Sequence, residues 1–249
     1  MYTNFHDLKK PFEDKKVDVT IILPIYNPND SWDLELEKNL DEIFELFKHL
    51  MIKVILVNDG TSFCMLQKAK RLKNRFPDLE TVNHIKNRGK GFAIRSGILF
   101  AESNYYIYSD WNFPFGKKIV YDMFSVLSNT NTDIVVSRSS NNYYKSLPFT
   151  RRIISQCLAV INSEALVCGK IETLNGLKGL NTVGVKILMK TKTNSDIFEY
   201  ELIRAILKKK VNLTFINSTT DKNIVLNNFK PKTVLRETKS LIRILMNRT

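Results

Sequence analysis

The sequence predicts an α/β protein in which helices flank a mostly parallel central sheet. Short apolar runs alternate with amphipathic stretches of 12 to 18 residues, which is the pattern of successive β-α units. Several of the apolar runs end in Asn, Asp or Gly, as strands do where a parallel sheet binds ligands. A chain of 249 residues, 43% hydrophobic and 25% charged, can bury a sizeable core as one globular domain.

The first β-α unit begins near the amino terminus. Residues 17–24 are an apolar run that predicts a buried strand, and residues 26–30, which contain Asn and Pro, predict the loop after it. Between residues 33 and 50 the apolar side chains recur at alternating steps of four and three, which predicts an amphipathic helix. They are Leu36, Leu40, Ile43, Phe47 and Leu50.

Two more strands follow in the same manner. Residues 52–57 predict a strand that ends in Asn58-Asp59-Gly60, and a Lys-rich helix should then run to about Phe76. A short third strand is expected over residues 79–85. Residues 87–91 then open a helix that runs to about Glu102; this segment contains Gly89-Lys90-Gly91, which resembles a phosphate cradle without the spacing of a P-loop.

The fourth strand, residues 105–108, stops at Asp110, with Asn112 two residues later. Pro114 and Gly116 force a turn directly afterwards. A carboxylate at a strand's carboxyl end can anchor a metal ion or a phosphate group. The alternative is that Asp110 only caps the turn, as strand-ending Asp often does.

The second half of the chain continues the alternation. A strand over residues 133–137 ends at Arg138, and a polar loop, residues 139–145, leads to Arg151-Arg152 and a helix through about Val167. The remaining expected elements are a short strand at 176–180, a helix at 196–210 and a strand at 211–217.

The net charge of +13 is concentrated near the carboxyl terminus, because residues 186–249 contain 14 Lys or Arg against 5 Asp or Glu. This imbalance favours an anionic partner, either nucleic acid, a membrane surface or a phosphorylated substrate, although it can also serve solubility alone. Lys232, Arg236, Lys239 and Arg243 recur at steps of four, three and four. This spacing predicts a basic amphipathic helix over 230–249 that either binds a membrane surface or packs on the core with its basic side in water.

Other segments point to a cytoplasmic protein. No apolar run approaches the roughly 18 residues that span a bilayer, and residues 1–16 lack a signal-peptide core. The three cysteines show no metal-binding spacing, so we expect free thiols and no zinc site. The residues considered are Cys64, Cys157, Cys168, His6, His49 and His84, none of which lies in a Cys, His or carboxylate cluster of the sequence.

Four markers occur in a fixed order: Leu-Pro-Ile-Tyr-Asn, Val-Asn-Asp-Gly-Thr, Asn-Arg-Gly-Lys-Gly and Asp-Trp-Asn. This order resembles the family 2 inverting glycosyltransferases with the Rossmann-like GT-A fold, and among them the dolichyl- or polyprenyl-phosphate sugar synthases. The resemblance covers residues 17–245. It implies a single glycosyltransferase domain, 1–249, with a nucleotide-sugar half at 17–138, an acceptor half at 139–229 and the amphipathic helix at 230–249.

The resemblance implies a set of donor-binding residues. The ends of the first two strands would hold the base and ribose, with Pro28 in place of the family's usual Glu, and a carboxylate there can accept hydrogen bonds from a uracil N–H or ribose hydroxyls. The alternative for Asp59 is a turn or helix cap. The implied nucleotide-sugar ligands are Pro24, Tyr26, Asn27, Asp59, Gly89, Lys90 and Asp110.

The family's D-x-D metal motif corresponds here to Asp110-Trp111-Asn112, in which an amide replaces one carboxylate. The implied cofactor is Mg²⁺ or Mn²⁺, held by Asp110 and Asn112, which would neutralise the leaving nucleoside diphosphate. Loss of one charged ligand should weaken the site. Asp110 is accordingly a predicted catalytic residue.

Lipid-phosphate synthases bind the acceptor phosphate with residues that Arg138, Arg151 and Ser155 resemble. Arg152 is the alternative to Arg151 in this role. Residues 172–179 resemble the family's D-T-x-x-G-x-K-G segment, with Glu172 in place of Asp. In members that glycosylate a hydroxyl, a carboxylate near here can act as base, so it is the second predicted catalytic residue. Residues 198–202 resemble F-D-x-E-L and are expected to be mainly structural.

The resemblance therefore implies an inverting, metal-dependent transfer of a hexose from a nucleoside-diphosphate sugar, expected to be UDP-linked, to a polyprenyl phosphate. The enzyme would lie at the inner face of the membrane as a peripheral protein. The alternative acceptor is a saccharide hydroxyl, as in capsule or lipopolysaccharide assembly. A glycosyltransferase-like binding protein without activity and a nucleic-acid-binding protein are two other hypotheses; because no nucleic-acid motif accompanies the basic residues, we expect no nucleic-acid partner.

Overall fold

The computed structural model describes residues 17–60, 63–139 and 176–219. Within these ranges the chain forms a seven-stranded sheet with the strand order β3-β2-β1-β4-β6-β5-β7. The strands are β1 (Val17–Ile25), β2 (Ile52–Asp59), β3 (Leu79–His84), β4 (Ser103–Tyr108), β5 (Ile134–Ser139), β6 (Lys178–Asn181) and β7 (Leu213–Ser218). The helices are α1 (Trp32–Leu46), α2 (Phe63–Arg75), α3 (Lys90–Phe100), α4 (Lys118–Asn129), α7 (Thr182–Leu188) and α8 (Phe198–Leu207).

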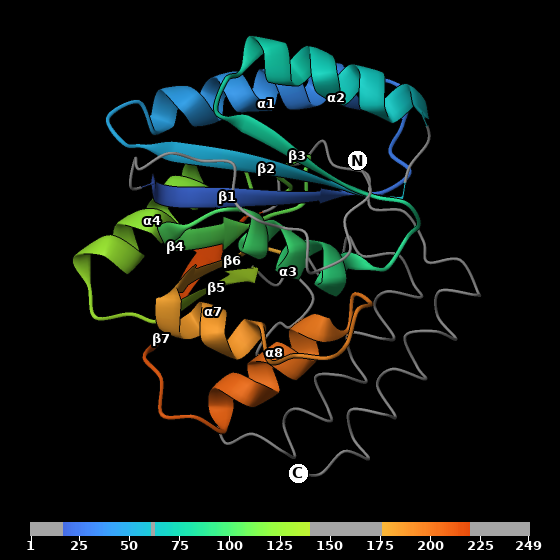
Figure 1. The fold of residues 1–249 in the computed structure, drawn as a ribbon. Coiled ribbons are helices and arrows are strands. Elements are labelled where there is room, and N and C mark those ends of the chain that lie inside the picture. Colours follow the sequence, from blue (N-terminus) through green and yellow to red (C-terminus); the bar gives the residue numbers. More distant parts are fainter. Residues whose placement is uncertain (1–16, 61–62, 140–175, 220–249) are drawn as a thin grey trace.

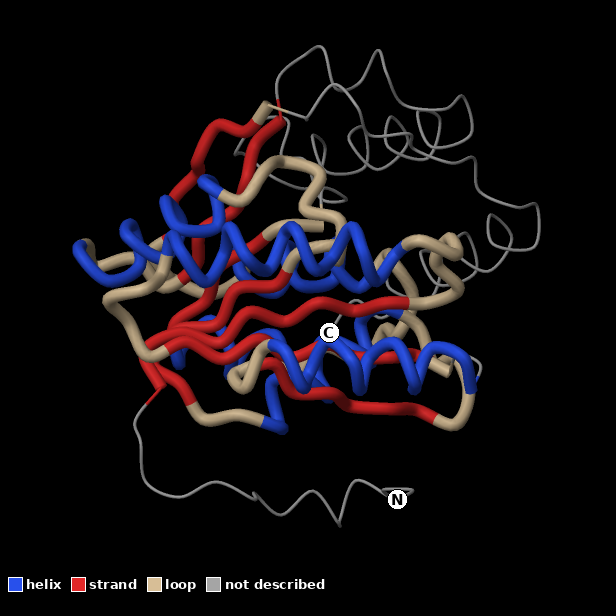
Figure 2. The backbone as a smooth tube through the Cα atoms, turned by 90° about the horizontal axis from the view of Figure 1, so that it is seen from above, coloured by secondary structure: helices blue, strands red, loops and turns tan. Residues whose placement is uncertain are grey.

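The sheet is mostly parallel, as predicted. β1 pairs in parallel with β2 and β4, β2 with β3, and β5 with β7. β6 runs antiparallel to both of its neighbours, β4 and β5. The amino end of β6 therefore lies at the edge of the sheet where the other strands have their carboxyl ends. Figure 2 shows the strands turning gradually relative to one another across the sheet, which is the usual twist of a sheet.

Helices cover both faces of the sheet, because successive strand residues point to opposite faces. Ile21 and Leu23 of β1 pack with α1, α2 and α4 in one core, whereas Ile22 between them packs with α3, α7 and α8 in the other. Figure 1 shows α1 and α2 on one side of the sheet, with α7 and α8 on the other. Two buried layers thus hold the strand ends in fixed positions.

The structure extends and adjusts the elements predicted from sequence. Two helices that were not predicted, α4 and α7, complete the two layers. Asn181 begins α7 by accepting hydrogen bonds from the backbone N–H groups of Val183 at 2.8 Å and Gly184 at 3.1 Å. The helix predicted at 196–210 is α8, which is shorter at both ends.

Some predicted elements lie outside the described residues, namely the loop at 140–145, the helix from Arg151 to about Val167 and the amphipathic helix at 230–249. The division of the chain into a donor half, an acceptor half and a terminal helix stays a prediction. Within the described ranges, none of the helices combines the length and the apolar character needed to cross a membrane.

Candidate functional site

The polar strand ends meet at one edge of the sheet because of the strand register. Ile22 of β1 pairs with Tyr108 of β4, and Tyr108 pairs with Lys178 of β6. Two residues beyond Tyr108 the chain reaches Asp110, and two residues before Lys178 it reaches Gly176. These residues therefore come together at the boundary between β4 and β6.

Asp110 lies in the tight turn that follows β4. Its carbonyl oxygen accepts a hydrogen bond from the N–H of Phe113 at 3.0 Å, and Phe113 has the unusual φ of 46°. The carboxylate is 40% exposed and receives the ammonium of Lys90, whose Nζ lies 2.6 Å from Oδ1. An exposed carboxylate held at a stiff strand end can take up a ligand from solvent.

Lys90 is the first residue of α3, after Gly89 with a φ of 97°. Its side chain is 18% exposed and lies between two carboxylates, with Nζ 2.6 Å from Asp110 Oδ1 and 4.0 Å from Glu199 Oε1. Burial alone would lower the pKa of Lys90, but the charges of Asp110 and Glu199 outweigh that effect and raise it. The ammonium is therefore charged throughout the physiological range.

Glu199 and Lys178 form a buried ion pair beneath Lys90. Lys178 Nζ donates to Glu199 Oε2 at 2.6 Å, and the two side chains are 0% and 2% exposed. Glu199 lies in the first turn of α8, where the helix dipole favours a negative charge. Burial, followed by the charges of Glu199 and Asp110, raises the pKa of the neighbouring Tyr108 hydroxyl well above its ordinary value.

The backbone of Gly176 packs closely against the side chains of Asp110 and Lys90. A Cβ atom at Gly176 would lie 2.9 Å from Asp110 Oδ2 and 3.0 Å from Lys90 Nζ. Its φ of 71° is also one that glycine adopts far more readily than other residues. The turn before β6 thus lies so close to Asp110 and Lys90 that any larger residue at position 176 would displace their side chains.

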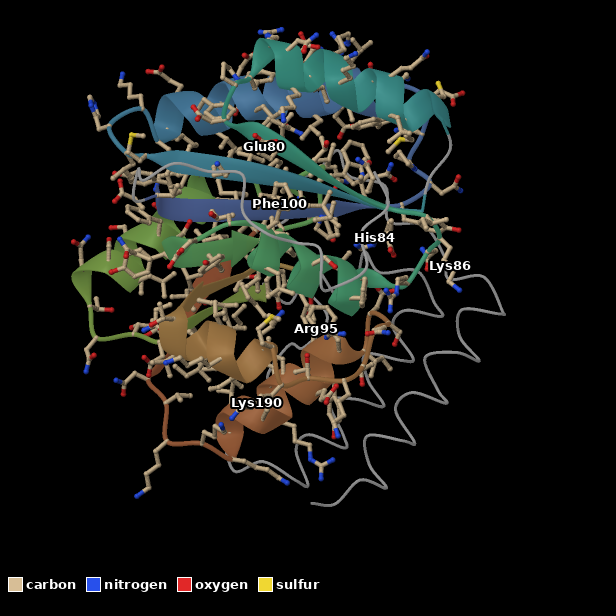
Figure 3. The ribbon with its side chains drawn as sticks, viewed as in Figure 1. Glu80, His84, Lys86, Arg95, Phe100 and Lys190 are labelled. Carbon is tan, nitrogen blue, oxygen red and sulfur yellow. The ribbon has the colours of Figure 1, made fainter. Side chains whose placement is uncertain are left out.

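Asp59 holds the loop between β3 and α3. Its carboxylate accepts hydrogen bonds from the backbone N–H groups of Arg88 at 3.0 Å and Gly89 at 2.8 Å. His84 Nδ1 lies 2.8 Å from Asp59 Oδ1, and Figure 3 shows His84 at the end of β3. The strands β2 and β3 bring His84 beside this one carboxylate, 25 residues away in the sequence, a contact that the sequence does not indicate.

Asp59 therefore binds backbone amides 29 and 30 residues further along the chain. Its contact with a nucleotide and its alternative role as a cap of its own turn or helix both stay predictions. We expect Asp59→Ala to lower the free energy of unfolding by about 2–4 kcal/mol, because two backbone amides and His84 lose a buried carboxylate partner. Urea denaturation measures this effect.

The matched control is Asp133→Ala, because Asp133 also accepts from a backbone N–H, that of Asn212 at 2.9 Å, but in a more exposed place at the start of β5. A loss of stability no larger than that of the control would contradict the role of Asp59 in the loop.

The other predicted donor residues lie at the same edge. β1 is central, between β2 and β4, so Pro24, Tyr26 and Asn27 lie between Asp59 and Asp110 along the edge. Tyr26 is 56% exposed, and Asn27 has a φ of 46°. The exposure of Tyr26 and Asn27 leaves them open to a ligand, and contact of the three residues with a nucleotide stays a prediction.

Arg138 lies at the end of β5, separated from β4 by β6. At about 4.8 Å per strand, the chain at Arg138 is roughly 10 Å from the end of β4. The side chain is exposed, and its guanidinium lies 4.5 Å from the centroid of the Phe215 ring. Glu172, Arg151 and Ser155 lie outside the described residues.

Two residues of the site, Lys178 and Glu199, were not predicted from the sequence as functional; residues 198–202 were expected to be mainly structural. Both lie beside apolar residues, because Lys178 follows Leu177 in an otherwise uncharged segment, 177–180, and Glu199 lies between Phe198 and Tyr200. A charge in such a segment must be paired when the segment is buried. That pattern was the available signal, and it would have suggested an ion pair without indicating that Lys90 lies beside it.

The side-chain oxygen atoms of Asp110 and Asn112 fit a weakly held divalent cation. Asp110 has a carboxylate oxygen, Oδ2, to which none of the described residues donates a hydrogen bond, and Asn112 lies half-buried two residues later in the same turn. Carboxylate and amide oxygens are the ligands that Mg²⁺ and Mn²⁺ prefer. Across the described parts of the chain, no three His, Cys, Asp or Glu side chains gather as a metal site.

Comparison with known sequences gives a family and two relatives. The family described as glycosyl transferase family 2 matches residues 20–198. A dolichyl-phosphate beta-glucosyltransferase of Saccharomyces cerevisiae is 20% identical over 228 residues, which cover 83% of this chain and 68% of that protein. A dolichyl-phosphate beta-glucosyltransferase of Trichomonas vaginalis is 26% identical over 229 residues, covering 84% and 67%.

Solved structures share the fold. Glucosyl-3-phosphoglycerate synthase from Mycobacterium tuberculosis, in complex with Mn²⁺, uridine diphosphate and phosphoglyceric acid, has a TM-score of 0.69 at 15% identity, covering 93% of this chain and 78% of that one. Mannosyl-3-phosphoglycerate synthase from Rubrobacter xylanophilus has a TM-score of 0.68 at 13% identity, covering 93% and 74%. At these identities the likeness concerns the fold, a single α/β domain of the GT-A type.

Proposed function

Because the chain belongs to glycosyl transferase family 2 and is therefore a glycosyltransferase, we propose that it transfers a hexose from a UDP-sugar to a polyprenyl phosphate with inversion at the anomeric carbon. The observation that carries the proposal is the exposed Asp110 carboxylate, paired with Lys90, at the same sheet edge as the exposed Arg138. This edge offers one position for a donor diphosphate and another for an acceptor phosphate.

The donor half of the proposal places the diphosphate beside Asp110 and Lys90. Asp110 and Asn112 would hold Mg²⁺ or Mn²⁺, which when bound neutralises charge on the leaving nucleoside diphosphate. Lys90 at the start of α3 would add a further positive charge at the diphosphate. The solved structure that contains Mn²⁺ and uridine diphosphate has the same fold, which supports this choice of cation and nucleotide.

In the proposed reaction an acceptor phosphate oxygen attacks the sugar C1 atom. The bond between C1 and the diphosphate breaks, and its electron pair leaves with the nucleoside diphosphate. A phosphate acceptor is already ionised and needs no base. Arg138, Arg151 and Ser155 would hold it, because guanidinium groups bind phosphate in a bidentate manner. The two dolichyl-phosphate beta-glucosyltransferases among the relatives support a lipid phosphate as acceptor.

We also propose that the basic stripe at Lys232, Arg236, Lys239 and Arg243 brings the enzyme to an anionic membrane surface at the inner face of the membrane. Each Lys or Arg near such a surface contributes about 1 kcal/mol. This would place the active site beside a lipid acceptor.

The acceptor is tested with two variants. We expect Arg138→Ala to reduce transfer to a polyprenyl phosphate by about tenfold or more, because the acceptor phosphate loses a charged partner, and to leave slow donor hydrolysis unchanged. Glu172→Gln should leave the same transfer almost intact. Radiolabelled sugar incorporated into lipid measures both.

The control for Arg138→Ala is Arg75→Ala. Arg75 likewise lies over a phenylalanine ring, 5.2 Å from the centroid of Phe76, but on α2 and away from the proposed site.

The alternative acceptor, a saccharide hydroxyl, requires a base and makes the opposite prediction. An inactive Glu172→Gln together with an active Arg138→Ala would replace the lipid phosphate with that alternative.

A further inference from the structure

Lys90 has a second anionic partner within reach of its present one. Its ammonium is bound to Asp110 Oδ1 at 2.6 Å, and Glu199 Oε1 lies 4.0 Å away. A charge-assisted hydrogen bond to a carboxylate is about 2.8 Å long, so Nζ needs to move by little more than about 1 Å to bind Glu199 instead. A lysine side chain has enough rotatable bonds to make such a movement without the backbone.

Glu199 is prepared to receive that ammonium. Oε2 is taken by Lys178 at 2.6 Å, whereas Oε1 is buried and, among the residues that the structure describes, has no hydrogen-bond partner. A buried carboxylate oxygen without a partner is unfavourable. Because the side chain is 2% exposed and held by Lys178, Glu199 cannot turn toward Asp110, so Lys90 is the group that can move.

The two carboxylates differ in what else can reach them. The Asp110 side chain is 40% exposed and has a carboxylate oxygen that fits a divalent cation, whereas the Glu199 side chain is buried away from solvent. A divalent cation at Asp110 would repel the ammonium that now lies 2.6 Å from Oδ1. Among the described residues, Glu199 Oε1 is the other carboxylate oxygen paired with Lys90, at 4.0 Å, and none of them donates a hydrogen bond to it.

We infer that Glu199 is a positioning residue for the metal site: Lys90 neutralises Asp110 when the site is empty and moves to Glu199 Oε1 when Asp110 binds a divalent cation. This inference rests on the cation site of the proposed function. Lys90 thereby competes with the cation for Asp110, and Glu199 weakens the competition by giving the displaced ammonium a partner.

The test is Mn²⁺ binding without donor or acceptor, followed by electron paramagnetic resonance, in a double-mutant cycle. We expect Lys90→Met to bind Mn²⁺ about tenfold more tightly than wild type, because the competing charge is absent. Glu199→Gln should bind it about tenfold more weakly than wild type. In the Lys90→Met background the same Glu199→Gln change should have less than about a third of that effect on the binding free energy, because no ammonium needs to be received.

Equal effects of Glu199→Gln in both backgrounds would overturn the inference, because Glu199 would then act on the cation through space alone. Asp110→Asn separates this failure from that of the proposed function. If Asp110→Asn abolishes Mn²⁺ binding, the cation site is supported, whatever Lys90 does. If Asp110→Asn leaves Mn²⁺ binding unchanged, both the cation site and the inference are wrong.

A crystal structure of the wild-type protein with Mn²⁺ and no nucleotide decides the case if Glu199→Gln fails to fold after Lys178 loses its partner. The expected result is Lys90 Nζ within hydrogen-bond distance of Glu199 Oε1 and separated from Asp110. A bound Mn²⁺ with Lys90 still on Asp110 Oδ1 would overturn the inference while leaving the cation site in place.

Discussion

Replacing Asp110 with Asn should reduce glycosyl transfer about a thousandfold while leaving the thermal unfolding temperature almost unchanged. Asn keeps the shape of the side chain and the turn, in which the hydrogen bond to the N–H of Phe113 comes from the Asp110 carbonyl. The substitution removes the negative charge that would hold the cation and orient Lys90, and loss of preorganised charge at a transferring group costs rates of this order.

The control is Asp122→Ala. Asp122 is also paired with a lysine, Lys118 at 2.8 Å, but on the surface of α4, where such pairs contribute little. It should keep transfer within about twofold. Turnover by Asp110→Asn equal to that of this control would mean that Asp110 serves the turn alone, the alternative that the sequence leaves open.

Gly176→Ala should reduce transfer about a hundredfold, because the new methyl group would lie 2.9 Å from Asp110 Oδ2 and 3.0 Å from Lys90 Nζ. Both atoms end side chains, so they can yield, but a displacement of about 1 Å at a reacting centre has effects of this size. The left-handed φ of 71° adds a cost of about 1 kcal/mol in stability. Steady-state kinetics and urea denaturation on the same preparation measure the two effects.

Gly116→Ala is the matched control for this change. Gly116 has a similar φ of 80°, but a Cβ there would meet nothing within 4 Å. The free energy of unfolding of the Gly116→Ala variant should fall by about the same 1 kcal/mol, and the transfer rate of this variant should not change. Equal activity losses in the two variants would show that backbone strain, and not the crowding of Asp110 and Lys90, is responsible.

The fold was largely predictable because the hydrophobic pattern carries it. The strand at 17–24 and the helix at 33–50 have the periods of a buried strand and an amphipathic helix. Both are present, although the helix already ends at Leu46. The helix α4 was missed although Ile119, Val120, Met123 and Leu127 have helical spacing and are buried. The helix α7 spans 7 residues, too few for a period to be recognised.

The site was predictable where a residue ends a strand, and not where two distant segments meet. Asp110 follows an apolar strand, so its place at the carboxyl edge could be inferred. Lys178 and Glu199 are brought together only when β6 and α8 pack, and no spacing in the sequence encodes that distance. The partners of Asp59 depend on the path of the loop at 86–89, which local propensity does not determine.

The most direct test of the central claim is a transfer assay with a panel of radiolabelled UDP-hexoses, polyprenyl phosphate and Mn²⁺. We predict label in the lipid fraction for at least one donor, and its loss when a chelator removes the cation or when the acceptor phosphate is omitted. Label that enters a saccharide with a free hydroxyl and never the lipid phosphate would contradict the proposed acceptor. Transfer that continues unchanged in the presence of the chelator would contradict the cation site at Asp110.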